Sequence, residues 1–402
     1  MTEAGYQVNL DNSERKILFE GVYKVKHKWT IFAVLAFLVL VVNSVSGAVK
    51  TIKIDSVRNK GVLEGEDFQI IDKFVADAVR ELVKTRDFTS IARIRTVILA
   101  RKSSSRDSAA AQYAEQFSKS AYKYISSSLK EASGLTPKER KFKVVLNLLI
   151  LVDGLSDLRL LDLAMEKLND DNTVIRYWAV HSVTNPGVTK QLNSAKAANL
   201  NLARNIVGRL KGLVERASPE TIALMAEFAA EVDIPQGEDL LLQIADMRIN
   251  KYANWTVDYE LLDASILRLL CNKISSGSLN KPAIARRFGQ LYSYAIQKYV
   301  KVKERDFLAA TRISQLASVL VETEDKCIRE LLGQRQMVIK RAVERDDVAG
   351  LLLEHNRLLG DETRSGELAV KLNFDYGPNP NGNKRTAPLT LPEPPEELII
   401  DN

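Results

Sequence analysis

A helical spacing of apolar residues runs through most of this 402-residue chain and constrains its fold more than any other feature. Between about 66 and 360, apolar side chains recur at intervals of three and four residues, as from Phe68 through Ile71 and Phe74 to Leu82. That interval places them on one face of an amphipathic helix. The chain holds only 11 proline and 19 glycine residues, which favours long helices over short strands and tight turns. The sequence therefore predicts an all-α fold.

Polar, glycine and proline breaks divide the pattern into separate helices. The segments 136–139 (TPKE) and 218–220 (SPE) carry a hydroxyl, a proline and an acid in the order of helix starts, and the first has the form of a capping box. We expect about thirteen helices, at 68–82, 88–101, 108–132, 137–152, 158–168, 173–184, 194–217, 219–232, 238–252, 258–274, 282–303, 307–323 and 326–359.

Short links between successive helices predict antiparallel neighbours. A chain of such hairpins forms either a large bundle or a superhelical solenoid. About thirteen helices exceed what one compact bundle usually holds. We therefore expect an α-solenoid over 66–372.

An apolar stretch near the N-terminus is the second constraint. From 29 to 49 there is no charged residue, and 29–42 (WTIFAVLAFLVLVV) is apolar except for Thr30. A helix of this length spans about 31 Å, enough for one bilayer crossing. An indole at the start of the stretch suits the headgroup region. We expect a transmembrane helix at 29–49, anchored by Trp29, Phe32, Leu35, Phe37 and Leu40.

Two other interpretations of this stretch stay open. A cleaved signal peptide is one, because 45–48 (VSGA) offers small residues for a signal peptidase, although the long leading segment favours an uncleaved anchor. A buried core helix is the other, although no other part of the chain is charge-free for so long. Basic residues flank the stretch in nearly equal number. We expect 1–28 to be a cytoplasmic arm, 50–65 a linker, and the body to lie outside the cytoplasm.

The C-terminal residues differ in composition from the rest of the chain. The segment 373–402 holds more than half of the prolines, so we expect a disordered or extended tail. Its end, 391–401 (LPEPPEELIID), combines acids with an apolar tip, as a docking peptide would. A solvated tail without a partner is the alternative.

One segment, 158–184, has the order of a helical repeat: a leucine-rich first helix, an Asp/Asn turn, and a second helix in which Arg176 follows Val174 by two residues. It resembles a HEAT-type repeat, of the wider class that includes armadillo and TPR repeats. The resemblance implies a right-handed solenoid, core positions for Val174 and Ala179, and a ladder between neighbouring repeats formed by Asp171 and Arg176. No second clean copy is found, which leaves the number of repeats open and admits a mixed helical array.

Recognisable catalytic and metal-binding motifs are absent from the sequence. His27, His181 and His355 have no Cys or carboxylate cluster at ligand spacing around them. Cys271 and Cys327 are too few for a disulfide framework. Phosphate-binding loops, nucleophile elbows and zinc-protease motifs do not occur. We therefore expect no enzyme activity, no cofactor and no metal.

Positive charge is concentrated in the body of the chain. Of the net charge of +6, the arm 1–28 carries +1 and the tail 373–402 carries −3, which leaves +8 for the body. A solvated face with internal salt bridges is the default interpretation of such runs. The alternative is a basic binding face for an acidic partner, for which the candidates are Arg286, Arg287, Lys298, Lys301, Lys303 and Arg305.

Together these features predict a non-catalytic, membrane-anchored scaffold or assembly subunit. A solenoid exposes a long surface suited to large or extended partners, so protein partners in a membrane-associated complex are expected. A binder of anionic lipid or polymer through the basic face is one alternative, and a divergent enzyme without a recognisable motif is another. Nucleic acid is not expected as a partner, and the oligomeric state stays open.

Overall fold

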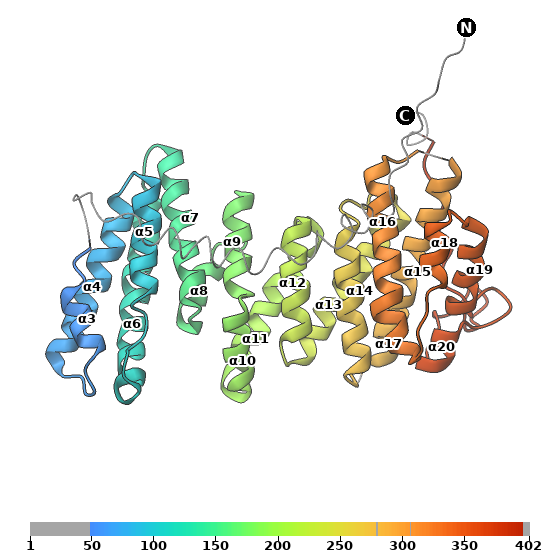
Figure 1. The fold of residues 1–402 in the computed structure, drawn as a ribbon. Coiled ribbons are helices and arrows are strands. Elements are labelled where there is room, and N and C mark those ends of the chain that lie inside the picture. The colour runs from blue at the N-terminus through green and yellow to red at the C-terminus, as the bar shows by residue number, and fades with distance from the viewer. Residues whose placement is uncertain (1–48, 279, 306, 397–402) are drawn as a thin grey trace, which may run out of the picture. The chain divides into compact units, whose positions relative to one another are not determined.

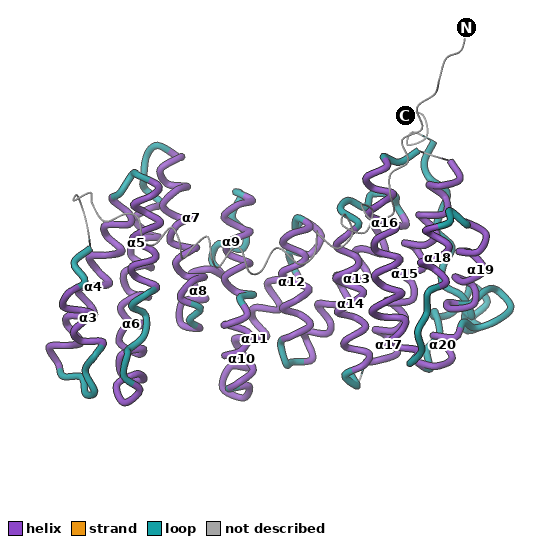
Figure 2. Tube along the Cα trace, in the orientation of Figure 1, coloured by secondary structure: helices purple, strands orange, loops and turns teal. Residues whose placement is uncertain are grey.

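The computed structural model describes residues 49–278, 280–305 and 307–396. The chain divides into two compact units, Met1–Lys50 and Thr51–Asn402, and nearly all described residues belong to the second. Regular structure among these residues is helical, apart from two isolated β-bridges that pair Gly360 with Ser365 and Pro378 with Lys384, as Figure 2 shows. The predicted helical character is confirmed for this part of the chain.

The helices of the second unit follow one another in chain order (Figure 1). What we call the first part comprises α3 (Ile52–Arg58), α4 (Gly65–Lys84), α5 (Phe88–Leu99), α6 (Asp107–Ala132), α7 (Lys138–Leu155), η1 (Leu158–Leu160), α8 (Leu161–Met165), α9 (Thr173–Val183), α10 (Pro186–Ser194), α11 (Lys196–Lys211) and η2 (Val214–Arg216).

The second part comprises the remaining helices and the chain that follows them. Its helices are α12 (Pro219–Glu231), α13 (Pro235–Ala253), α14 (Leu261–Ser275), α15 (Lys281–Arg305), α16 (Ala310–Thr323), η3 (Glu324–Ile328), α17 (Arg329–Leu332), α18 (Val338–Glu344), α19 (Val348–Leu359) and α20 (Glu367–Leu372).

Helices pack both on their sequential neighbours and on helices two positions away. α4 packs on α6, α7 on α9, α13 on α15 and α14 on α16, while α12 packs on α13 and α14 on α15. This alternation is that of helices stacked in two layers, with an apolar core between them. The predicted apolar faces supply that core: in α4, Ile71, Phe74, Ala78 and Leu82 are all buried.

Capping residues explain several helix starts. The Asn172 side chain accepts hydrogen bonds from the backbone N–H groups of Val174 and Ile175 at the start of α9. Ser218 caps α12, with proline in the first turn, as the sequence predicts. The prediction for 136–139 is wrong, because Pro137 itself is the N-cap of α7 and no side chain caps that end.

The predicted transmembrane helix is not supported by the structure. None of the helices in the described ranges is long and apolar enough to cross a bilayer. The segment 29–48, with Trp29, Phe32, Leu35, Phe37 and Leu40, and the arm 1–28 lie outside the described residues. The assignment as a single-pass membrane protein, together with its orientation, is therefore withdrawn.

Two further boundaries are corrected. The segment 50–65, expected to be a linker, contains the helix α3, whose Ile54 and Val57 are buried. The tail, expected to be disordered, is packed against the array as far as it is described: Tyr376 and Leu391 are 2% and 1% exposed. The sequence could not show this burial, because the residues that cover the tail lie far away along the chain.

Candidate functional site

Helix α15 (Lys281–Arg305) is the structural centre of the second part. It packs on α13, α14, α16, α19 and α20, and most of its residues from Ile284 to Val302 are buried. All six residues of the predicted basic face lie on it. Each of the six forms an ion pair with a carboxylate, so the predicted face is not a free cationic surface.

Three of these residues tie α15 to its own surroundings. Arg287 binds Asp246 of α13 with both oxygens of the carboxylate, at 2.9 and 3.1 Å. Lys298 is buried and lies 3.1 Å from Glu260, and Lys303 pairs with Asp346 at 2.9 Å. Their role in the structure is to join α15 to the array.

The other three hold the C-terminal part of the chain. Arg286 donates to the Asp375 backbone oxygen at 2.7 Å and to its carboxylate at 3.0 Å. Arg305 binds the Glu393 carboxylate at 2.7 Å, and Lys301 binds its other oxygen. The basic residues of α15 thus do bind an acidic chain segment, and that segment belongs to the same molecule.

We name residues 386–396 the docked segment. Its contacts advance along α15 in the direction of the helix: Leu389 meets Gln290, Leu391 meets Gln297, and Glu393 meets Lys301 and Arg305. At its first residue, Thr386 donates to the Asp361 backbone oxygen at 2.7 Å. The segment therefore lies parallel to α15 and is tied to the array at its start.

Two glutamines bind the backbone of the docked segment. Gln290 accepts from the Leu389 N–H at 2.8 Å and donates to the Leu389 carbonyl at 3.2 Å. Gln297 accepts from the Leu391 N–H at 2.7 Å and donates to the same carbonyl at 3.2 Å. Seven residues along a helix make about two turns, so both amides lie on one face. Backbone groups are common to all residues, so these hydrogen bonds recognise an extended backbone and not a particular side chain.

Burial along the docked segment repeats every third residue. Pro388, Leu391 and Pro394 are buried, whereas the residues between them are exposed. A polyproline II helix has three residues per turn, so one of its faces would carry these three side chains. The docked segment thus presents a polyproline II pattern to the array.

Trp255 supplies a further contact. Its Nε1 donates to the Pro392 carbonyl at 3.0 Å, and its ring packs beside Phe307 with 5.6 Å between ring centroids. The φ angles of Trp255 and Tyr259 are 58° and 53°, in the left-handed region that such residues rarely adopt. Backbone strain of this kind persists only where surrounding contacts impose it.

Two buried ionic clusters impose that conformation on the loop between α13 and α14. Arg248 donates to both oxygens of Asp263, at 2.7 and 3.0 Å, and to the Asp258 backbone oxygen. Arg312 donates to the Val257 backbone oxygen at 2.6 Å and also binds Glu260. The loop is therefore fixed by charged side chains on both of its flanks.

The Glu260 cluster combines one carboxylate with two cations, Lys298 and Arg312. Burial is the largest influence on the pKa of Lys298 and lowers it, despite the neighbouring carboxylate. Burial also acts to raise the pKa of Glu260, but the hydrogen bond from Arg312 and the charge of Lys298 outweigh it, and that pKa is lowered. The Lys298 ammonium also lies 5.5 and 5.9 Å from the ring centroids of Tyr252 and Trp255.

A hydrogen-bonded chain connects Gln297 to His355. Gln297 Nε2 donates to Ser293 Oγ, and Ser293 Oγ lies 2.8 Å from His355 Nε2. Because the Leu391 N–H can only donate, Gln297 must turn its oxygen to Leu391 and its amide nitrogen to Ser293. Ser293 then donates to a neutral imidazole whose proton is on Nδ1, facing Asn356 Oδ1 at 2.9 Å. Burial lowers the pKa of His355, which favours this neutral form.

The residues of the predicted HEAT-type repeat lie on the α8–α9 pair. Ala179 is fully buried, whereas Val174 is 42% exposed, so the prediction of a core position for Val174 is wrong. Arg176 donates to the backbone oxygens of Asp170 and Asp171, at 2.8 and 3.1 Å, and so fastens the turn of its own pair. These contacts are within one pair and not the ladder between neighbours that the resemblance implies.

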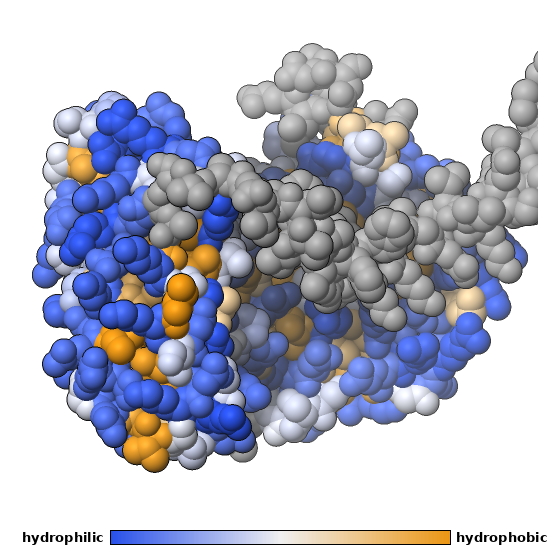
Figure 3. All heavy atoms as spheres, turned by 60° about the vertical axis from the view of Figure 1, so that its left-hand side comes forward, coloured by the Kyte–Doolittle hydropathy of each residue, from blue (hydrophilic) through white to orange (hydrophobic). Residues whose placement is uncertain are grey.

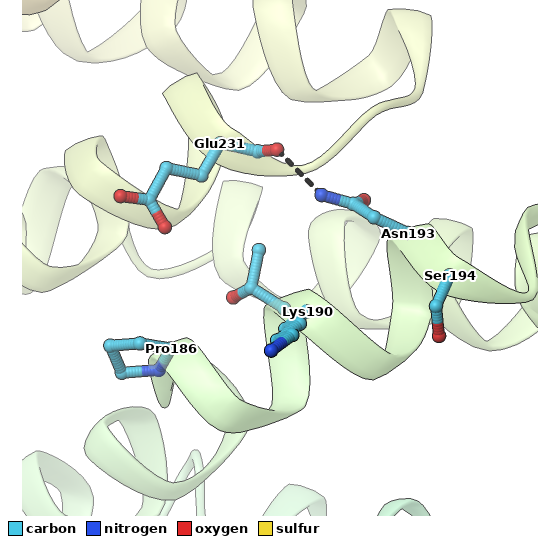
Figure 4. Close-up of a pocket in the computed structure, with 6 residues that line it drawn as sticks. Pro186, Lys190, Asn193, Ser194 and Glu231 are labelled. Carbon is cyan, nitrogen blue, oxygen red and sulfur yellow. Dashed lines mark hydrogen bonds between the residues drawn. The ribbon is translucent and has the colours of Figure 1, made fainter.

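Other surfaces of the described residues show no comparable arrangement. In Figure 3 the face of the first part is mainly hydrophilic, and its apolar residues form small separate clusters. A hollow of about 550 Å³ between α10 and the end of α12 is lined by Pro186 and by five polar or charged residues, and Asn193 donates to the Glu231 carbonyl at 2.9 Å (Figure 4). In the described ranges, no group of His, Cys, Asp and Glu side chains is placed to hold a metal ion.

Sequence reasoning identified the basic residues of α15 and a possible docking peptide at 391–401, but it missed the glutamines, Trp255 and the start of the docked segment. One signal for the segment was present: Pro388, Leu391 and Pro394 are spaced at the period of a polyproline II helix. A second was the pair Gln290 and Gln297, which share a face of a helix. Comparison of the chain with protein-family models, with curated proteins and with solved structures finds no match.

Proposed function

We propose that the protein is a non-catalytic scaffold that binds a partner protein through a helical-repeat surface. The observation that supports this most is the docking of residues 386–396 on α15. Two glutamines, a tryptophan and two cations together hold an extended chain by its backbone and by one acid. A surface built to hold an extended peptide is suited to recognising a segment of another protein.

We also assign the array to the HEAT-like class of α-solenoids. Support comes from the α8–α9 pair, in which Asn172 caps the second helix and Ala179 lets the two helices approach closely. It comes also from the packing of helices two apart, which is how stacked hairpins bury a continuous core. The α-helices of the described residues differ in length from 4 to 26 residues, so the repeats are irregular.

The binding of anionic lipid or polymer is a weaker explanation of the same residues. The six candidate basic residues of α15 are already paired with carboxylates. A polyanion would have to break these pairs before it gained a charge contact with any of the six. No feature of the described residues favours an enzyme over a binding protein.

Isolation of the tagged protein from its native cells after light crosslinking tests the scaffold proposal. We expect a protein partner in near-equal amount, with crosslinks on the array, at both about 50 mM and about 500 mM salt. Recovery of the protein alone at both salt concentrations would contradict the proposal. So would a partner that is retained only at low salt, because such a result points to polyanion binding.

A further inference from the structure

The docked segment is held by few of its own side chains. Its backbone bonds to Gln290, Gln297 and Trp255 do not depend on residue identity. Beyond the backbone, the array contacts three buried side chains, one at every third position, and one carboxylate. The requirement is therefore Pro-x-x-Leu-x-Glu-Pro in an extended conformation, which many unrelated protein segments can satisfy.

The chain that leads into the docked segment is held to the array by contacts of its own. Arg286 holds Asp375, Tyr376 is buried against Gly289, and Thr386 binds the Asp361 carbonyl. These contacts all precede residue 388. Residues 388–396 of the docked segment can therefore leave α15 while the chain up to Thr386 stays in place.

The contacts at the far end of the segment are exposed. Glu393 is 63% and Arg305 is 42% exposed as side chains, and ion pairs of this kind contribute little to stability. A segment tied at one end is held mainly by its high effective concentration, which a ligand of the same chemistry can overcome.

We infer that the surface formed by α15 and Trp255 is a docking site for an acidic, proline-containing segment of a partner protein, of the pattern Pro-x-x-Leu-x-Glu-Pro, and that the docked segment competes with that partner. The charge complementarity of Glu393 with Lys301 and Arg305 selects an acid at this position. This inference rests on the proposed function only in assigning the competing segment to a partner protein.

The test uses the full chain and a fluorescent peptide of sequence TAPLTLPEPPE, which copies residues 386–396. Leu391→Asp places a carboxylate at a position that is 1% exposed. It should release the docked segment and leave the binding surface of α15 and Trp255 intact. Glu393→Lys is a second releasing variant, because it places a positive charge beside the cations Lys301 and Arg305. The matched control is Leu389→Asp, since the Leu389 side chain is 45% exposed.

We expect the Leu391→Asp and Glu393→Lys chains to bind the peptide about tenfold more tightly than the wild type and Leu389→Asp chains. Adding Gln297→Ala to Leu391→Asp should weaken binding about tenfold, because two hydrogen bonds are lost. A scrambled peptide of the same composition should not bind. Circular dichroism of each variant checks that the helices are retained.

Three results would overturn the inference: no binding by either releasing variant, equal binding of the scrambled peptide, or equal binding by wild type and releasing variants. A wild-type dimer that becomes monomeric on Leu391→Asp would also overturn it, because the occupant would then be a second copy of the chain. Failure to isolate a partner from cells leaves these binding measurements intact, so it would count against the proposed function alone.

Discussion

The first and second parts of the array are built from similar helices but differ in how they bury charge. In the first part Asp67 is a buried carboxylate, bound by Lys60 at 2.7 Å, while pairs such as Arg159 with Glu115 are exposed. The buried charged residues of the second part are more numerous: Arg248, Glu260, Asp263, Lys298, Glu324 and Glu354.

This difference follows the location of the candidate site. A buried charge is costly unless it is paired and hydrogen-bonded, and the buried residues of α7 are apolar except for Asn147. The clusters around Glu260 and Asp263 flank the loop that carries Trp255. Four of the six buried charges of the second part belong to the two clusters beside the strained loop. The other two, Glu324 and Glu354, lie elsewhere in the second part.

The strongest test of this comparison is the removal of one buried carboxylate. Glu260→Gln leaves Lys298 and Arg312 without their counter-charge, so we expect it to lower the free energy of unfolding by about 3–5 kcal/mol. The matched change in the first part, Glu115→Gln, removes an exposed partner of Arg159 and should have almost no effect. Urea unfolding followed by circular dichroism measures both. Similar small losses in the two variants would contradict the comparison.

The sequence predicted helices in both parts, but in the first part it missed α3 and α10. The apolar spacing at 68–82 correctly indicated α4, because the buried residues of an amphipathic helix recur at the helical period within that one segment of sequence. The helix expected at 326–359 was wrong: it is divided among η3, α17, α18 and α19, with Gly333 in the left-handed region at the first break. Glycine is a recognised helix stop, so that break was readable in the sequence.

For the candidate site, the sequence identified the basic residues of α15 but not the acids that pair with them. The basic residues of α15 were identified from their local clustering, but their partners are distant: Glu260 is 38 residues from Lys298, and Glu393 is 92 residues from Lys301. Ion pairs across such separations leave no periodic signal in the chain. Only the fold brings them together, which is why the basic run could not be distinguished from a free cationic face.

Leucine truncations compare the core with the docked segment. Leu148→Ala, at a fully buried position of α7, should lower the free energy of unfolding by about 2–5 kcal/mol. Leu391→Ala also removes a buried side chain, but we expect it mainly to release residues 388–396, with a smaller change in the unfolding transition. Urea unfolding and hydrogen exchange of the segment distinguish the two. Equal losses of global stability would show that the segment belongs to the core.

Two helical glycines give a smaller effect of opposite sign in the two parts. A Cβ on Gly289 would lie 2.9 Å from the Tyr376 hydroxyl, whereas a Cβ on Gly208 of α11 would meet nothing within 4 Å. Gly289→Ala should therefore destabilise by about 1–3 kcal/mol through overpacking, and Gly208→Ala should stabilise by about 0.5–1 kcal/mol through helix propensity. Thermal unfolding measures both, and equal signs would contradict this account of the packing at Tyr376.

The smallest expected effect is a pH response that differs in sign between the parts. The hydrogen bond with Asp153, at 2.7 Å, raises the pKa of His181 in the first part, against the effect of burial. Its stabilising effect is full below the unfolded pKa of about 6.5 and is lost as pH rises through the folded pKa. Burial lowers the pKa of His355 in the second part. Its contribution is present above about pH 6.5 and is lost as pH falls through the folded pKa.

Acidification from about pH 8 to about pH 5.5 should therefore strengthen α9 and weaken the hold on the docked segment. A protonated His355 donates from Nε2, so the Ser293 hydroxyl loses its acceptor and its oxygen must accept from both His355 and Gln297. Hydrogen exchange of the two regions, corrected for the intrinsic pH dependence, measures the response. His181→Gln should abolish it only in α9, and His355→Gln only in residues 386–396. A response of one sign in both regions would mean that the two histidines do not report their local environments, because opposite pKa shifts require opposite slopes.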